Sequence, residues 1–60
     1  MQTVTSALVE AQMARSLREA ERLIVHGDVR VNDRLVSRPD AIVDRPATLS
    51  VGRRRSTRLT

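Results

Sequence analysis

Arginine is the residue type through which this sequence can do chemistry. All eleven of its lysine-or-arginine positions are arginine, against seven acidic residues, and the formal net charge is +4. A guanidinium group presents a planar fork of N–H donors that matches a phosphate group and can stack on a base. Arg15, Arg18 and Arg22 recur at helical spacing, and residues 53–55 are three consecutive arginines. The pattern predicts a phosphate-binding surface; the alternative is that the arginines only solvate a small domain.

The sequence has few residues suited to metal binding or catalysis. The sequence has no cysteine and one histidine, His26, so it predicts no metal site and no cofactor. Ser16 has no base positioned to activate it, and no glycine-rich phosphate loop or isolated carboxylate pair is present. We therefore expect a non-catalytic module. His26 is interpreted as a cap at the C-terminal end of a helix, where a cation interacts favourably with the helix dipole.

The absence of aromatic residues narrows the nucleic acid that this surface would bind. Proteins that hold single strands commonly stack bases on aromatic rings, each worth about 1–3 kcal/mol. Arginine contacts to phosphates and 2′-hydroxyl groups suit folded RNA that is recognised by its shape. The predicted partner is structured RNA, bound in a strongly salt-dependent way.

The size and apolar content predict one small domain covering residues 1–60. A chain this short buries only about 60% of its unfolded surface, so stability is expected to be marginal. Apolar residues make up 40% of the chain, which is typical of a folded protein. No secretion signal and no apolar run of membrane-spanning length is evident. We expect a cytoplasmic protein without a membrane partner.

Two helices are predicted to position the arginines. Over residues 4–13, apolar side chains recur at helical spacing and Thr3 or Thr5 supplies a cap. A second helix over residues 16–26 begins with Ser16 as N-cap and Glu19 three residues later, a capping box, and is ended by Gly27. The apolar positions of the two helices are Val4, Ala7, Leu8 and Ala11, and Leu17, Ala20, Leu23 and Ile24.

Arg15, Arg18 and Arg22 fall roughly opposite the apolar stripe of the second helix, at about 100° per residue. Glu19 lies four residues after Arg15 and three before Arg22. Surface ion pairs worth roughly 0.2–0.5 kcal/mol each are therefore the alternative explanation of this stripe. We assign Glu19 to the helix cap, because a carboxylate among the arginines would repel phosphate.

The remaining sequence predicts short antiparallel strands. Alternating apolar residues indicate strands over 29–31, 34–37, 48–51 and 56–60, and residues 41–43 form a short apolar segment. Asn32 and Asp33 fit the two positive-φ positions of a hairpin turn. The fold class is α+β, with two short N-terminal helices packed on a small antiparallel β-sheet in the order α-α-β-β-β-β.

These residues resemble a known family. The segments are Ala7-Leu8-Val9-Glu10-Ala11, Ala14-Arg15-Ser16, Glu19-Ala20, Arg22-Leu23-Ile24, Gly27 and Val29-Arg30-Val31-Asn32. Together they are similar to the S-four (S4) RNA-binding domain, also called the αL motif. Residues 50–55, Ser-Val-Gly-Arg-Arg-Arg, further resemble the ending of this domain where it closes bacterial tyrosyl-tRNA synthetases. The resemblance implies an αL-type fold and binding of a tRNA arm or a ribosomal RNA junction, with association with the ribosome and translation.

The sequence departs from the family pattern at a few positions. Leu17 and Glu21 stand where the family commonly has arginine, with Arg18 one place later. Gln12 and Asp33 replace two family glycines, one after the first helix and one in the hairpin. The loss of helix cations motivates an alternative, a protein-interaction module that has kept the fold but binds RNA weakly. Binding of DNA through the basic helix also stays open.

From the arginine pattern and the resemblance together, we predict the RNA-binding residues. They are Arg15, Ser16, Arg18, Arg22, Arg30, Asn32, Arg53, Arg54 and Arg55. For Asn32, the role of a turn residue is the stronger of two interpretations.

Overall fold

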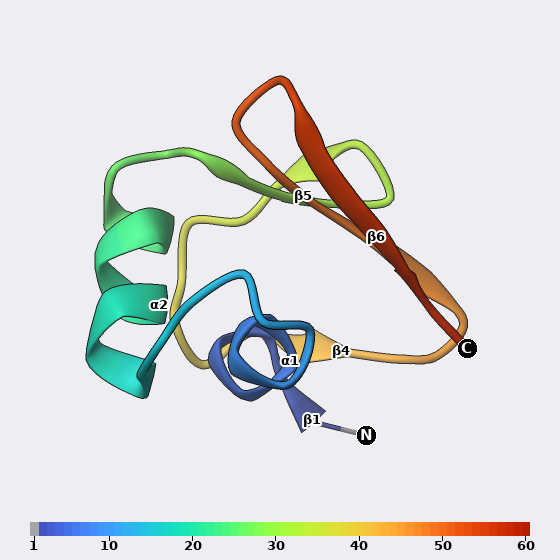
Figure 1. The fold of residues 1–60 in the computed structure, drawn as a ribbon, viewed down its shortest axis with the longest axis horizontal. Helices are drawn as coiled ribbons and strands as arrows, with labels where there is room; N and C mark the ends of the chain where they lie inside the picture. Colours follow the sequence, from blue (N-terminus) through green and yellow to red (C-terminus); the bar gives the residue numbers. More distant parts are fainter. Residues whose placement is uncertain (1) are drawn as a thin grey trace.

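The computed structural model describes residues 2–60, which form two helices and six short strands. Figure 1 shows α1 and α2 on one side of a twisted sheet whose strands follow both helices in the sequence. This confirms the α+β fold with two short N-terminal helices. The elements are β1 (Gln2–Thr3), α1 (Val4–Glu10), α2 (Leu17–Val25), β2 (Val29–Val31), β3 (Arg34–Leu35), β4 (Ile42–Val43), β5 (Ala47–Val51) and β6 (Arg55–Leu59).

Helix α1 is capped at both ends by local hydrogen bonds. The Thr3 hydroxyl accepts the backbone N–H of Ser6 at 3.3 Å, so Thr3 is the N-cap. At the other end the chain turns through Gln12, whose φ is 62°. The N–H groups of Gln12 and Met13 donate to the carbonyls of Val9 and Leu8, which is a Schellman motif. The helix therefore ends at Glu10, and the predicted end at residue 13 was wrong.

Helix α2 has the predicted boundaries. The Ser16 hydroxyl accepts the backbone N–H of Glu19 at 3.1 Å, which confirms Ser16 as the N-cap. Gly27 has φ 78°, and its N–H and that of Asp28 donate back into the last turn of the helix. This second Schellman motif has glycine at the left-handed position where α1 has Gln12. Both helices thus end in a Schellman motif.

The main sheet has four antiparallel strands in the order β3-β2-β5-β6. Asn32 and Asp33 both have positive φ, 52° and 68°, which confirms the two-residue hairpin turn between β2 and β3. Strand β3 is shorter than the predicted strand over residues 34–37, because it ends at Leu35. A separate pair, β1 with β4, holds the start of α1 against the segment around Ile42. The predicted order lacked β1 and treated β4 only as an apolar segment.

The sheet has one buried face and one open face. Ala47, Leu49 and Val51 of β5 are buried, while the residues between them, Thr48 and Ser50, point away from the core. The core joins these residues to the apolar faces of both helices. Its buried members are Val4, Ala7, Leu8, Met13, Ala14, Ala20, Ile24, Val29, Val43, Ala47, Leu49, Val51 and Leu59.

One predicted core residue lies outside the core. Leu17 is the first residue of α2 and is 56% exposed, whereas Ala20 and Ile24 are buried and Leu23 packs partly against the core. The helical wheel gives the angle of a side chain around the axis, but it does not say how far along the axis the core extends. Leu17 lies beyond that limit, in the first turn of the helix.

Candidate nucleic-acid interface

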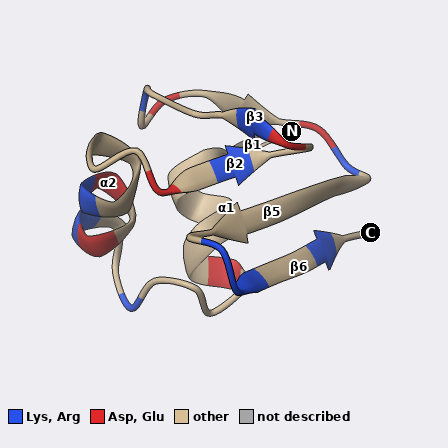
Figure 2. Ribbon diagram, turned by 90° about the horizontal axis from the view of Figure 1, so that it is seen from above, with Lys and Arg blue, Asp and Glu red and all other residues tan. Residues whose placement is uncertain are grey.

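Most of the arginines have no carboxylate partner. Within residues 2–60, ion pairs join Arg38 to Asp40 at 3.3 Å and Arg45 to Glu10 at 3.0 Å. The other nine arginines form none in this part of the chain. Their guanidinium groups keep donors for an external anion, and the charge is spread over α2, the sheet and the β5–β6 turn (Figure 2).

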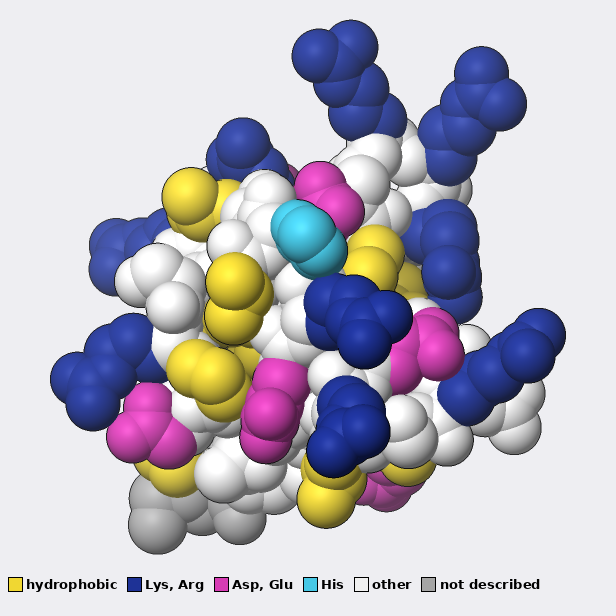
Figure 3. All heavy atoms as spheres, turned by 90° about the vertical axis from the view of Figure 1, so that its left-hand side faces the viewer, with side chains coloured by type: hydrophobic (Ala, Val, Ile, Leu, Met, Phe, Trp, Pro, Cys, Tyr) yellow, Lys and Arg dark blue, Asp and Glu magenta, His cyan; other side chains and the backbone are white. Residues whose placement is uncertain are grey.

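The arginines of α2 are exposed on its outer side. Arg15 precedes the helix, and Arg18 and Arg22 lie one turn apart within it. The expected alternative, ion pairs from Glu19 to Arg15 and Arg22, is not formed. Figure 3 shows the face that α2 presents, on which positive side chains extend from the centre to the edges, beside exposed hydrophobic ones.

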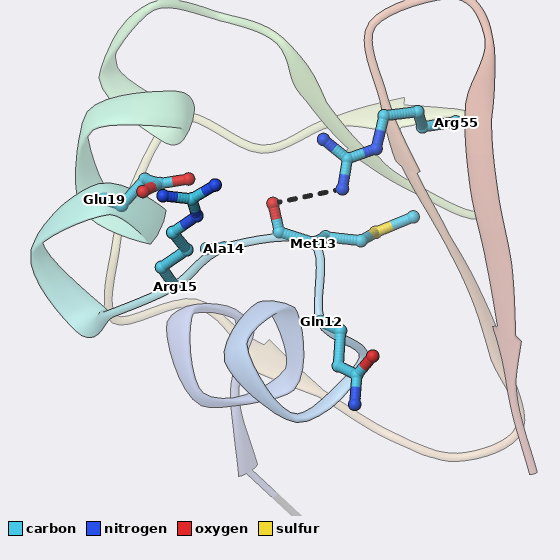
Figure 4. A pocket seen from close by; sticks show the side chains of 6 residues that line it. All are labelled: Gln12, Met13, Ala14, Arg15, Glu19 and Arg55. Carbon is cyan, nitrogen blue, oxygen red and sulfur yellow. Dashed lines mark hydrogen bonds between the residues drawn. The ribbon is translucent and has the colours of Figure 1, made fainter.

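Arg15 shares a hollow with a cation from the far end of the chain. Arg15 and Arg55 line one hollow of about 400 Å³ between the α1–α2 connection and the start of β6. The Nη2 group of Arg55 donates to the Met13 carbonyl at 3.4 Å, which holds β6 against the connection (Figure 4). Because β6 pairs with β5 along its whole length, Arg55 is fixed at the edge of the sheet. The structure thus brings together one arginine from each of the two predicted groups.

Arg53 and Arg54 form the exposed turn between β5 and β6, next to Arg55. We call the set Arg15, Arg18, Arg22, Arg53, Arg54 and Arg55 the arginine surface. Arg30 is not part of it. Arg30 pairs with Ser50, and its buried neighbour Val29 faces the core, so Arg30 lies on the open face of the sheet, away from the helices. The structure therefore does not bring the predicted residue Arg30 together with the arginines of α2.

Two polar residues of the predicted site have structural contacts. The Ser16 hydroxyl oxygen accepts the Glu19 N–H that begins α2. The Asn32 side-chain oxygen accepts the Thr48 N–H at 3.0 Å, and the Asn32 N–H donates to the Thr48 carbonyl at 2.9 Å. Asn32 therefore joins the hairpin turn to β5.

The Glu19 carboxylate is placed differently from the expectation. Its backbone N–H caps the helix, but its side chain makes no return hydrogen bond to Ser16 and instead lines the hollow with Arg15 and Arg55. The capping box is thus half formed. Sequence reasoning also missed Gln12 and Met13, which complete the hollow, because contacts between the connection and β6 join distant parts of the chain and leave no local pattern.

Residues 2–60 show neither of two other kinds of site. They contain no group of three or more histidine, cysteine, aspartate or glutamate residues arranged to hold a metal ion. Neither helix in this part of the chain has the length and apolar character needed to cross a membrane.

Comparison with known proteins identifies the family. A scan against protein-family profiles matches residues 6–47 to the S4 domain. The chain therefore belongs to the S4 domain family, whose members are non-catalytic RNA-binding domains. The matched segment includes most of α1, all of α2, the β2–β3 hairpin and β4, and it ends at the first residue of β5. A search of curated proteins found no significant match.

Proposed function

We propose that this chain binds structured RNA through the arginine surface, without catalysis. The observation that carries the proposal is the convergence of Arg15 and Arg55 on one hollow, although they come from opposite halves of the chain. Membership of the S4 family supports RNA as the ligand. The unpaired guanidinium groups support contact with phosphates, because within residues 2–60 they form no ion pair with a carboxylate.

We propose a tRNA arm or a ribosomal RNA junction as the RNA, in the cytoplasm and in the service of translation. Both are folded RNAs, which suits a surface that has arginines and no aromatic rings. Residues 50–55 resemble the ending of the tyrosyl-tRNA synthetase module and favour a tRNA. They lie beyond the segment that matches the family. In a synthetase the module would position tRNA while another domain performs the chemistry; on the ribosome it would hold a junction.

The test is RNA binding by charge-neutralised variants. Fluorescence anisotropy with unfractionated tRNA and with a ribosomal RNA junction fragment should show weaker binding for Arg18→Ala/Arg22→Ala and for Arg53→Ala/Arg54→Ala. The matched control is Arg34→Ala/Arg58→Ala, which loses the same charge at the far edge strand and on the open sheet face. For about four neutralised phosphates, log K should fall with log salt at a slope of about −3 to −4. Equal affinity of all three variants would contradict the assigned surface.

A protein-interaction module on the same fold is the second candidate. Leu17 and Val25 of α2 are 56% and 74% exposed, and hydrophobic side chains stand beside the arginines on this face (Figure 3). Large exposed apolar side chains that gather on one face are typical of protein contacts. This candidate predicts that no RNA is retained at low salt. A competition in which duplex DNA displaces structured RNA equally well would instead support DNA binding.

A further inference from the structure

The hollow that Arg15 and Arg55 border is a partly open depression lined mainly by polar atoms. It is lined by Gln12, Met13, Ala14, Arg15, Glu19 and Arg55, and its volume of about 400 Å³ lies within the range of pockets that hold small molecules. Figure 4 shows Arg15 and Glu19 on the α2 side and Arg55 across from them. Met13 and Ala14 are buried, so the floor is fixed by the core.

The two guanidinium groups of the hollow favour one shared anion. Neither Arg15 nor Arg55 is paired with a carboxylate in the described part of the chain. Arg55 uses one of its N–H groups on the Met13 carbonyl and keeps the others. Two cations at one hollow repel each other, and a phosphate that contacts both would offset that repulsion and accept hydrogen bonds from both.

Glu19 gives the hollow a second kind of specificity. Its carboxylate has no hydrogen-bond partner within residues 2–60, and it faces the same space as Arg15. An ionised carboxylate only accepts hydrogen bonds, so it repels a phosphate but binds a hydroxyl group. The group of a nucleic acid that distinguishes RNA from DNA is the 2′-hydroxyl, which can donate to such an acceptor.

We propose that this hollow holds a single ribonucleotide of the bound RNA, with its phosphate between Arg15 and Arg55 and a 2′-hydroxyl donating to Glu19. The proposal rests on the proposed function and adds to it that the chain distinguishes RNA from DNA at this position.

The first arm of the test asks whether the two arginines share one phosphate. Arg15→Ala, Arg55→Ala and the double variant are titrated with a synthetic RNA stem-loop at several salt concentrations, after melting curves have shown that each is folded. Each single variant should bind about tenfold more weakly, because it loses a charged hydrogen bond. The double variant should lose much less than the product of the two effects, with a salt slope lower by about 0.9 rather than 1.8. Additive losses would overturn the shared phosphate.

Two further variants keep this arm decisive. Arg58→Ala removes the same charge from the same strand, on the open sheet face, and should leave the affinity within about twofold of wild type at moderate salt. If Arg55→Ala fails to fold for want of its bond to the Met13 carbonyl, Arg55→Gln replaces it, because glutamine keeps the first part of the aliphatic stem and a polar end while the charge is gone.

The second arm uses stem-loops that carry one 2′-deoxy nucleotide at each position in turn. With wild type, one position should lose several-fold in affinity when its hydroxyl is removed. Glu19→Ala should be insensitive at that position, while Glu21→Ala, which removes a neighbouring exposed carboxylate of α2, should keep the wild-type pattern. If Glu19→Ala keeps the same deoxy sensitivity, or strengthens RNA and DNA binding equally, Glu19 is only a repulsive charge and the proposal fails.

The two proposals fail differently. If wild type binds the stem-loop and depends on Arg18 and Arg22, but Arg15, Arg55 and Glu19 show no coupling, only the ribonucleotide site is wrong. If wild type binds no RNA at low salt, both proposals are wrong.

Discussion

Arg45 and Glu10 form an ion pair of 3.0 Å that joins the end of α1 to the segment before β5. Gln2 completes the cluster: its side-chain oxygen accepts from Arg45 Nη2 at 2.7 Å, and its Nε2 donates to Glu10 at 3.0 Å. Arg45 also donates to the Thr60 carbonyl at 3.3 Å. One arginine thereby links β1, α1 and the C-terminal end of the chain, away from the hollow.

This cluster predicts a loss of stability in acid. Hydrogen bonds from Gln2 and Arg45, together with the charge of Arg45, lower the pKa of Glu10 below its ordinary value of 4.5. A lowered folded-state pKa adds stability at pH values above the unfolded-state pKa, and that stability is lost as the pH falls through the folded-state pKa. Urea unfolding from about pH 6 to about pH 3 should therefore show a smaller decrease for Glu10→Gln than for wild type. Glu21→Gln is the control, and equal slopes for wild type and Glu10→Gln would contradict the role of Glu10.

Gln12 is the position at which a substitution should stabilise the fold. It is exposed and has φ 62° in the Schellman motif that ends α1. A non-glycine residue in this region is strained by about 1–2 kcal/mol. Glycine removes this strain, but it also makes the unfolded chain more flexible, which offsets part of the gain in stability. Gln12→Gly should raise the free energy of unfolding by about 0.5–1 kcal/mol, measured by urea denaturation.

The matched control for Gln12→Gly lies at the end of the other helix. Gly27 has φ 78° in the same motif, so Gly27→Ala should destabilise by about 1 kcal/mol. Asp33→Gly should gain less than Gln12→Gly, because aspartate tolerates the left-handed region better than glutamine does. If Gln12→Gly lowers the stability, the Gln12 side chain must make a contact worth more than its backbone strain.

The N-cap of α2 predicts a stability effect at Ser16. Its hydroxyl is the acceptor for the Glu19 N–H, and Ser16→Ala leaves that group without its partner. The expected loss is about 1 kcal/mol in the free energy of unfolding. For a domain of this size the melting temperature should fall by roughly 4–8 °C. Ser37→Ala, at an exposed serine outside the helices and strands, should leave the melting curve unchanged. Equal melting curves for Ser16→Ala and wild type would show that the cap contributes nothing.

Leu17 offers a gain-of-function test of the arginine surface. Its side chain is 56% exposed at the start of α2, so Leu17→Arg should fold without disturbing the core. A cation near a helix N-terminus costs a few tenths of a kcal/mol. If α2 faces RNA, one more phosphate contact should raise the affinity for tRNA at low salt and steepen the salt slope by about 0.9. An unchanged slope would place the start of α2 outside the interface.

Sequence reasoning predicted best those parts of the fold that are determined locally. Ser16, Gly27 and the pair Asn32-Asp33 each set a cap or a turn by their own hydrogen bonding or φ preference. The alternation of β5 likewise gave its buried and open faces, because successive side chains of a strand point to opposite sides. These signals depend on a few adjacent residues, so they can be read without knowledge of the rest of the fold.

The parts that sequence reasoning missed depend on contacts between distant segments. The pairing of β1 with β4 involves two residues from each strand, too few to make an alternating pattern. The contact of Arg55 with the Met13 carbonyl, and the open hollow that it borders, follow from how β6 docks on the connection between the helices. Alternation places Arg30 opposite Val29, but only the packed helices define which face is covered, so the separation of Arg30 from the arginines of α2 could not be read from the strand pattern.

Asn32 allows a structural role to be separated from an RNA contact. Its φ of 52° suits the hairpin turn, and its side-chain oxygen holds the Thr48 N–H at 3.0 Å. Asn32→Ala loses both the tolerated turn conformation and the hydrogen bond, so it should destabilise by about 2 kcal/mol. Asn32→Asp keeps a side-chain oxygen at the same place and should stay within about 0.5 kcal/mol of wild type in urea denaturation. The aspartate adds a negative charge without disturbing the turn, so we expect only the small loss of tRNA affinity that a distant charge causes. A large loss of tRNA affinity in that variant would show that Asn32 lies against the RNA backbone.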